Sequence, residues 1–262
     1  MNDWSIEIYK DQINSIDLAC KFSYSFPQRS NQFFEKVIGS VDGLNSRLFV
    51  LVIDGEIKGA TFAFKISGYN FDVWSPSYIY VEKEHRNISL LFIVGVLRNM
   101  GGKIINVSPT NDMKKILSAI KYKELSKGSL ILPAFQAIFW SIFKRKKSFS
   151  CTSPIDRFKQ RNDLMWVSLV NGGNFYCLKK TSRYGIQVFL LVYFDKTRLM
   201  DDIKDLCVFM AKINPLSILV VPNIFEITGV LSLKSSKFHT FSNINELGEI
   251  YSILGSEVTE VI

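Results

Sequence analysis

The sequence predicts an α/β protein in which a mixed, mainly antiparallel sheet flanked by helices occurs twice along the chain. Three observations lead to this prediction. An Asp54-Gly55 turn signal joins two β-rich runs. The apolar pattern then changes from the period of strands to the period of helices near Ser89. The second half repeats the same order, a strand meander followed by a helix and a strand.

The first half opens with two helices and continues into a hairpin. Apolar residues at helical spacing predict helices over 11–22 and 31–38. Runs rich in β-branched and aromatic residues predict hairpin strands over 48–53 and 57–66 and a third strand over 77–81. The first sheet is therefore expected to begin with an antiparallel meander of three strands.

The rest of the first half alternates helices and strands. A helix over 89–100 ends at Gly101-Gly102, a buried strand follows over 103–107, and a second helix covers 112–120. A last strand begins at 130–132. Because a helix connects strand 77–81 to strand 103–107, these two strands are expected to be parallel.

The second half predicts a similar unit from its element order alone. The expected elements are strands 164–169, 174–179 and 186–193, helix 199–213, strand 218–221 and a final helix 245–254. The expected division is a first domain over 1–133, a linker helix with a basic run over 134–150, and a second domain over 151–262.

Composition and charge restrict the classes of partner. The chain has 262 residues, is 47% hydrophobic and carries a formal net charge of +8, which favours anionic ligands. The basic residues show no zinc-finger spacing or basic heptads, so a nucleic-acid partner is a minor reading. Four widely spaced cysteines and two histidines predict no metal site, and reduced thiols favour a cytoplasmic location.

The segment between the halves leaves two readings open. No apolar run reaches the roughly 18 to 20 residues that a membrane helix needs. An apolar stripe over 135–143 precedes the basic run Lys144–Lys147. It fits a linker helix packed between two domains, which is the favoured reading, and it also fits peripheral membrane contact through 134–147.

The region from Leu48 to Pro133 resembles the GNAT family of acyl-CoA-dependent N-acyltransferases. Four features carry the resemblance: the hairpin with its Asp54–Gly59 turn, strand 77–81, the polar turn Glu82–Arg86 with the helix after it, and the strand and helix over 103–120. The family's Gly-Phe pair is replaced by Lys121-Tyr122.

The resemblance implies a cofactor site for acetyl-CoA or another acyl-CoA. The family's loop R/Q-x-x-G-x-G/A corresponds to Arg86-Asn87-Ile88-Ser89-Leu90-Leu91, with Ser89 in place of the first Gly. Backbone N–H groups of Arg86, Asn87, Ile88, Ser89 and Leu90 would hold the pyrophosphate at a helix N-terminus. Val81 would offer its backbone to the pantetheine arm, and Asn111 would lie near it. Ser89 could instead be only the N-cap of the helix.

The catalytic candidates are titratable residues around the same strand. Amine acylation needs a base for the ammonium group and an acid for the leaving thiolate. The base candidates are Glu82, Glu84, His85 and Asp72. Leu117 or Ser118 stands where the family often has a catalytic Tyr, so Tyr78, Tyr80 and Tyr122 are the substitutes. Of these, Glu82, Tyr78 and Tyr122 are the predicted catalytic residues.

The expected function is transfer of an acyl group, acetyl in the first instance, to a small-molecule amine. By resemblance, the acceptor would be an amino sugar or nucleotide sugar of a surface-polysaccharide pathway. Two alternatives stay open. One is a GNAT-like binding or scaffold module without catalysis, and the other is an aminoacyl-tRNA-dependent transferase with two GNAT-like units.

Overall fold

The first sheet is built around the predicted hairpin, which the structure confirms. In the computed structural model, Asp54 (φ 51°) and Gly55 (φ 82°) form a two-residue turn of type I′ between β2 (Ser46–Ile53) and β3 (Glu56–Ile66). The structure describes residues 4–9, 16–137, 149–150, 162–169, 172–224, 227, 229–236, 239–244, 250–253 and 256, with 149–150 as backbone only.

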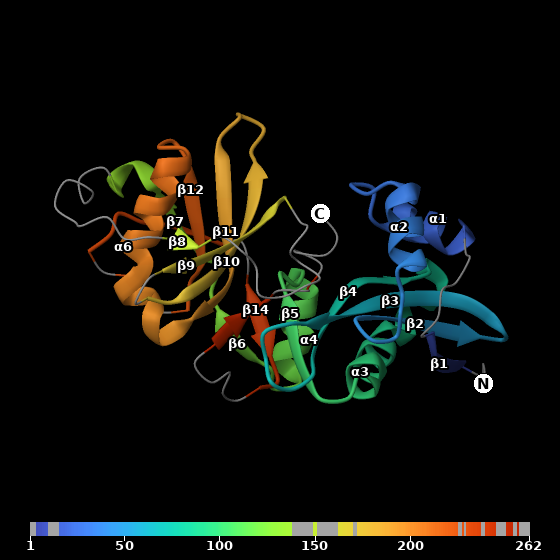
Figure 1. The fold of residues 1–262 in the computed structure, drawn as a ribbon. Helices are drawn as coiled ribbons and strands as arrows, with labels where there is room; N and C mark the ends of the chain where they lie inside the picture. Colours follow the sequence, from blue (N-terminus) through green and yellow to red (C-terminus); the bar gives the residue numbers. More distant parts are fainter. Residues whose placement is uncertain are drawn as a thin grey trace.

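Seven strands make up this sheet (Figure 1). Their order is β1-β2-β3-β4-β5-β14-β6. The strands beyond the hairpin are β1 (Trp4–Tyr9), β4 (Val73–Val81), β5 (Lys103–Val107), β6 (Lys123–Ser126) and β14 (Thr240–Ser242). All neighbours are antiparallel except β4 and β5, which are parallel as predicted.

Helices cover both faces of the first sheet, because alternate residues of each strand are apolar on both sides. In β2, Leu48 and Val50 pack with Phe22 and Phe34 of α1 (Ile16–Ser25) and α2 (Asn31–Gly39). Phe49 and other β2 residues pack on the opposite face against α3 (Ser89–Asn99). The 3-10 turn η1 (Lys83–Ile88) leads into α3, and α4 (Asn111–Ala119) follows β5.

The second sheet has the order β13-β7-β12-β11-β10-β9-β8. Its strands are β7 (Ser129–Pro133), β8 (Phe149–Ser150), β9 (Leu164–Leu169), β10 (Asn174–Thr181), β11 (Gln187–Asp195), β12 (Ile218–Pro222) and β13 (Leu233–Ser235). β15 (Ile250–Ser252) pairs with β11 outside this path. Helix α6 (Lys196–Ile213) connects β11 to β12, and the short turn η2 (Ala134–Gln136) follows β7.

The two sheets correspond position by position. Read from β1 and from β8, both show the same succession of strand directions, and in both the fourth and fifth strands are parallel. In both, the place after the fifth strand is taken by a strand from the other half of the chain. β14 enters the first sheet, and β7 enters the second. This agrees with the expected duplication of the fold.

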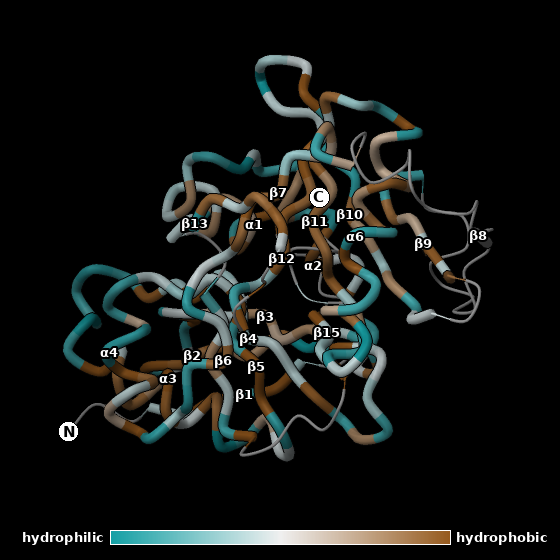
Figure 2. The backbone as a smooth tube through the Cα atoms, turned by 90° about the vertical axis from the view of Figure 1, so that its left-hand side faces the viewer, coloured by the Kyte–Doolittle hydropathy of each residue, from teal (hydrophilic) through white to brown (hydrophobic). Residues whose placement is uncertain are grey.

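Hydrophobic residues are concentrated in the strands, whereas the outer loops and turns are mostly hydrophilic (Figure 2). The largest buried cluster belongs to the second sheet and α6. Tyr69 and Phe71, in the loop between β3 and β4, pack against that cluster. The loop therefore connects the first sheet to the core of the second.

Several predicted elements differ in the structure. The prediction of a final helix over 245–254 is wrong at residues 250–252, because these residues form strand β15. Residues 245–249 and 254 lie outside the described residues. The strand at 130–132 exists, but it pairs in the second sheet rather than completing the first. Only 134–137 and 149–150 of the linker segment are described, so Lys144–Lys147 lie outside them. The domain boundary at 133 stays a prediction, and β7 and β14 cross it.

Candidate functional site

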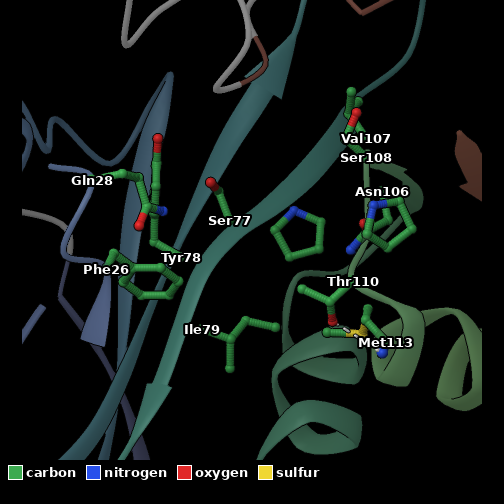
Figure 3. A pocket seen from close by; sticks show the side chains of 12 residues that line it. Phe26, Gln28, Ser77, Tyr78, Ile79, Asn106, Val107, Ser108, Thr110 and Met113 are labelled. Carbon is green, nitrogen blue, oxygen red and sulfur yellow. Dashed lines mark hydrogen bonds between the residues drawn. The ribbon is translucent and has the colours of Figure 1, made fainter. Parts of the chain in front are cut away.

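A cleft opens in the first sheet where β4 and β5 separate. The two strands pair only at Val73–Lys103 and Trp74–Ile104. Beyond these pairs lies a cavity of about 280 Å³ (Figure 3). Its lining residues come from the α1–α2 loop, β4, β5, the β5–α4 loop and α4: Phe26, Gln28, Pro76, Ser77, Tyr78, Ile79, Asn106, Val107, Ser108, Pro109, Thr110 and Met113.

A β-bulge in β4 shapes one wall of the cleft. Ala60 pairs with Tyr80 and Phe62 pairs with Ser77, so Tyr78 and Ile79 together oppose Thr61. Tyr78 has a positive φ of 53°. The Thr61 hydroxyl donates to the Ser77 carbonyl at 2.9 Å, which fixes the strand beside the bulge. Bulges of this kind redirect side chains and end regular pairing, and they are common next to active sites.

The cleft reaches both faces of the sheet. Phe62, the partner of Ser77, belongs to the core under α1 and α2, and Tyr78 packs there against Phe26. Ile79 packs in the core under α3. The lining of the cleft therefore includes residues from the α1–α2 side of the sheet and Met113 of α4.

Two polar residues in the cleft were missed by sequence reasoning. Ser77 is 4% exposed, and its hydroxyl has no hydrogen-bond partner within the described structure. Asn106 is buried on β5, on the opposite side of the cleft (Figure 3). Each is a polar residue in a buried strand, and Asn106 interrupts the apolar run Ile104–Val107. Buried polar groups usually have partners, so the Ser77 hydroxyl is an exception beside the cleft.

The predicted cofactor loop lies at the N-terminus of α3. Ser89 is the first residue of α3 and Ile88 is its N-cap, without a side-chain hydrogen bond. The reading of Ser89 as N-cap is therefore wrong, because η1 continues directly into the helix. Arg86 and Asn87 are exposed, and Arg86 forms no ion pair with any residue that the structure describes. Leu90 is also exposed.

The backbone N–H and C=O groups of Val81 face the edge of β4 that is not paired with β3. The N–H of Glu82 donates to the carbonyl of Lys58 at 2.8 Å, so residue 82 faces β3. Neighbouring residues of a strand direct their N–H and C=O groups to opposite edges. The N–H and C=O of Val81 therefore face the side from which β5 has separated.

Glu82 is held in an ion-pair network. Lys21 contacts its carboxylate at 2.7 Å and Lys58 at 3.6 Å, and the Tyr80 hydroxyl donates to it at 3.1 Å. Burial alone would raise the pKa of Glu82, but the hydrogen bond and charge of Lys21 outweigh burial and lower it. Burial, followed by the charge of Glu82, raises the pKa of Tyr80. A carboxylate with a lowered pKa is a weak base near neutral pH.

The other predicted site residues are scattered. Tyr78 lines the cleft, whereas Tyr122 packs in the core under α3, where burial raises its pKa to about 12. Asn111 is exposed at the start of α4, and the helix is capped by Thr110, whose hydroxyl accepts from Met113 N at 3.3 Å. Asp72 forms an ion pair with Lys65 at 2.6 Å.

His85 and Glu84 lie in η1, outside the lining of the cleft. They and Glu82 therefore do not gather around the cavity, and Tyr78 is the predicted catalytic residue that lines it.

The corresponding place in the second sheet is filled by the chain itself. β11 pairs with β12 over Val188–Leu190, and farther along β11 pairs with β15. The first turn of α6 is also occupied, because Asp195 accepts from the N–H and hydroxyl of Thr197 at 2.8 and 2.6 Å. A carboxylate at this cap disfavours a phosphate there. Within the described residues, only the first unit combines diverging strands with an uncapped helix.

Metal and membrane features are not found in the part of the chain that the structure describes. No three His, Cys, Asp or Glu residues there are grouped as a metal site. None of the helices described is both long and apolar enough to cross a bilayer. Cys177 and Cys207 are buried and Cys20 is exposed, all as free thiols. Burial raises the pKa of Cys207 to about 12, so this thiol is unreactive at neutral pH.

Comparisons with known proteins indicate a fold rather than a close relative. No model of a protein family matches the chain, and no curated protein sequence matches it. Among solved structures, a GCN5-related N-acetyltransferase from Anabaena variabilis is 11% identical with a TM-score of 0.58, covering 91% of this chain and 72% of that one.

Two further structures agree with this comparison. One from Kribbella flavida, also a GCN5-related N-acetyltransferase, is 10% identical with a TM-score of 0.55, covering 91% of this chain and 70% of that chain. A fungal GCN5-related glucosamine N-acetyltransferase region is 8% identical with a TM-score of 0.53, covering 92% of this chain and 38% of that one. The chain thus has the fold of GCN5-related N-acetyltransferases, as the sequence predicted.

Proposed function

We propose that the first unit transfers an acyl group from an acyl-CoA to an amine in the cleft between β4 and β5. The observation that carries the proposal is this open cleft, which lies beside an uncapped helix N-terminus in a GNAT-like fold. In the second unit, β15 fills the equivalent opening. The role of this unit is then to support the fold and the side of the cleft at which the acceptor binds.

The residues of the first unit fit an acyl-CoA. The uncapped N-terminus of α3, with Arg86 beside it, suits the pyrophosphate, because helix N-terminal N–H groups and their dipole attract anions. The Val81 backbone suits the amide groups of the pantetheine arm. When bound, the cofactor supplies an activated thioester.

Among the predicted catalytic residues, Tyr78 is the best placed. It lines the cleft from β4 and can donate a hydrogen bond or a proton to the leaving sulfur. Glu82 anchors Lys21 and Tyr80 rather than acting as a direct base, because its pKa is lowered. Tyr122 is assigned to packing. The acceptor is a small amine, for which an amino sugar or nucleotide sugar stays the expected class.

A second candidate is a GNAT-like binding module without catalysis. Two features favour this candidate. Leu91 is exposed at a position where the family has a small residue, and the carboxylate of Glu82 is already paired with Lys21. In that case the cleft still binds a ligand, but no acyl group is transferred. The aminoacyl-tRNA-dependent alternative uses the same two units with a different donor, and the net charge of +8 is compatible with it.

Calorimetric titration with acetyl-CoA and with CoA tests the proposal. We expect saturable binding with one site per chain, because only the first unit is open. Arg86→Ala should weaken binding by about tenfold or more, since a charge-assisted phosphate contact is lost. Arg183→Ala, an exposed arginine in the β10–β11 turn, is the matched control and should bind as wild type does.

The outcomes separate the candidates. Binding together with acceptor-dependent release of free thiol supports the transferase. Binding without any thiol release across an amine panel supports the binding module. No binding at millimolar acetyl-CoA would refute the acyl-CoA site. Ser77→Leu provides a second check, because a larger apolar side chain in the cleft should abolish binding while circular dichroism remains that of the folded protein.

A further inference from the structure

The cleft between β4 and β5 is lined by neutral side chains. On the premise of the proposed function, the chemistry of this lining reports on the acceptor that enters it. The described lining residues carry apolar, aromatic, hydroxyl or amide side chains, and none of them has a carboxylate, ammonium, guanidinium or imidazole group. A charge that is buried without a charged partner is costly, so these walls favour an uncharged ligand.

Two aromatic rings form one wall of the cavity. Phe26 of the α1–α2 loop and Tyr78 of β4 both line the cavity, and their rings meet edge to face with centroids 5.4 Å apart (Figure 3). Phe33 and Phe34 of α2 also pack edge to face on the Tyr78 ring, at 5.9 and 5.4 Å. The wall is therefore held by the fold itself, and it suits the flat apolar face of a ring.

Ser77 and Asn106 supply hydrogen-bonding groups without charge. Each side chain is 4% exposed, and each lines the cavity, one from β4 and the other from β5. The Ser77 hydroxyl has no hydrogen-bond partner, and the Asn106 side chain makes no hydrogen bond with any described residue. A hydroxyl and an amide can both donate and accept, so they suit hydroxyl, amide or uncharged amine groups.

Charged residues near the cleft are engaged elsewhere. The guanidinium of Arg29 lies 4.7 Å from the centre of the Phe33 ring. Asp112 forms an ion pair with Lys115 at 3.5 Å, and its side chain is 90% exposed. Glu82 is held in its ion-pair network and is not part of the described lining. An ammonium group inside the cavity would therefore find no carboxylate among the described lining residues.

The protonation state of the acceptor follows from these walls. Only the free base of an amine is a nucleophile, and each unit by which the amine pKa exceeds the pH lowers the free-base fraction about tenfold. An amine that enters uncharged needs no separate base. The proton that nitrogen loses when the amide forms equals the proton that the departing sulfur gains, and the Tyr78 hydroxyl can relay it.

We propose that the acceptor is a weakly basic amine carried on a ring, that it enters the cleft uncharged, and that its ring packs against Phe26 and Tyr78. Ser77 and Asn106 then offer hydrogen bonds to its neutral polar groups. An amino sugar fits this description, because its hydroxyl groups make the amine less basic than an alkylamine. The diphosphate of a nucleotide sugar would have to remain outside the cavity.

Titrations with three small aromatic amines test this inference. Aniline is uncharged at neutral pH, benzylamine carries an ammonium group on a similar ring, and para-aminobenzoate adds a carboxylate to aniline. Binding of each to the full-length protein is measured by NMR titration, without CoA and with saturating CoA. We expect aniline to bind about tenfold or more tightly than the other two. Phe26→Ala should weaken aniline binding about threefold to tenfold, because part of the aromatic wall is lost.

A charge placed in the lining provides the sharper test. Gln28→Glu introduces a carboxylate with little change of shape, so benzylamine should gain about threefold or more in affinity and para-aminobenzoate should lose affinity. Gln32→Glu is the matched control, because Gln32 is exposed on α2 outside the described lining, and it should keep the wild-type preference.

The outcomes separate this inference from the proposed function. Benzylamine or para-aminobenzoate binding as tightly as aniline, no binding of any amine at millimolar concentration, or a preference that Gln28→Glu leaves unchanged overturns the inference. Acetyl-CoA affinity is measured on the same protein. Absence of acetyl-CoA binding, with the preference for aniline intact, would count against the proposed function alone.

Discussion

Replacing Tyr69 by Phe should weaken the connection between the first sheet and β15. The Tyr69 hydroxyl donates to the Ser252 carbonyl at 3.2 Å and accepts from the Ser252 N–H at 3.0 Å. Ser252 is fully buried, so Tyr69→Phe removes two hydrogen bonds and leaves a buried N–H without its partner. A lost hydrogen bond costs about 1 kcal/mol, and an unsatisfied buried group costs about 1–3 kcal/mol.

We therefore expect a loss of about 2 kcal/mol, because the ring itself stays packed. In a chain of this size each kcal/mol lowers the melting temperature by roughly 2–4 °C, so the expected drop is about 4–8 °C. Differential scanning calorimetry measures it. Tyr24→Phe is the control, since Tyr24 is 90% exposed. If Tyr69→Phe melts within about 1 °C of wild type, then Tyr69 does not hold β15 in place.

Three further predictions concern single side chains. Glu82→Gln should cost about 1 kcal/mol at pH 7 and less at about pH 3: the lowered pKa of Glu82 contributes stability above the ordinary carboxyl range, and this stability is lost as the pH falls through the lowered pKa. Equal loss at both pH values in urea unfolding would contradict the ion-pair assignment. Phe22→Ala should cost about 3–5 kcal/mol in the same assay, because the ring of Phe22 is fully buried and its centroid lies 5.1 Å from that of Phe34 and 4.9 Å from that of Phe62. A cost below about 1 kcal/mol would exclude that packing. Asp195→Ala should cost about 1 kcal/mol through loss of the α6 cap and leave acetyl-CoA binding unchanged, whereas a second acetyl-CoA site would contradict the assignment of the second unit.

Strands with a strong local signal could be predicted to the residue. Lys103–Val107 and Leu164–Leu169 are apolar runs bounded by turn or polar residues, and both form strands over those bounds. β14 and β15 have three residues each and become strands only by pairing with segments far away in the sequence. No local pattern could distinguish β15 from the end of a helix.

The candidate site was predicted only in part, for similar reasons. The position of the predicted cofactor loop at the start of a helix follows from the change of period near Ser89. The place of Ser77 and Asn106 in the lining of the cleft depends on the separation of β4 from β5, which is a property of the sheet.

The exchange of β7 and β14 has a consequence for biosynthesis. Thr240 of β14 bonds through its hydroxyl to Ser126 of β6, 114 positions earlier, and β14 lies between β5 and β6. On the ribosome, the sheet that carries the cleft cannot close until β14 has emerged. Until then β5 and β6 expose strand edges to other nascent chains. The protein is therefore expected to depend on chaperones during synthesis, and a fragment ending at residue 133 should aggregate rather than fold.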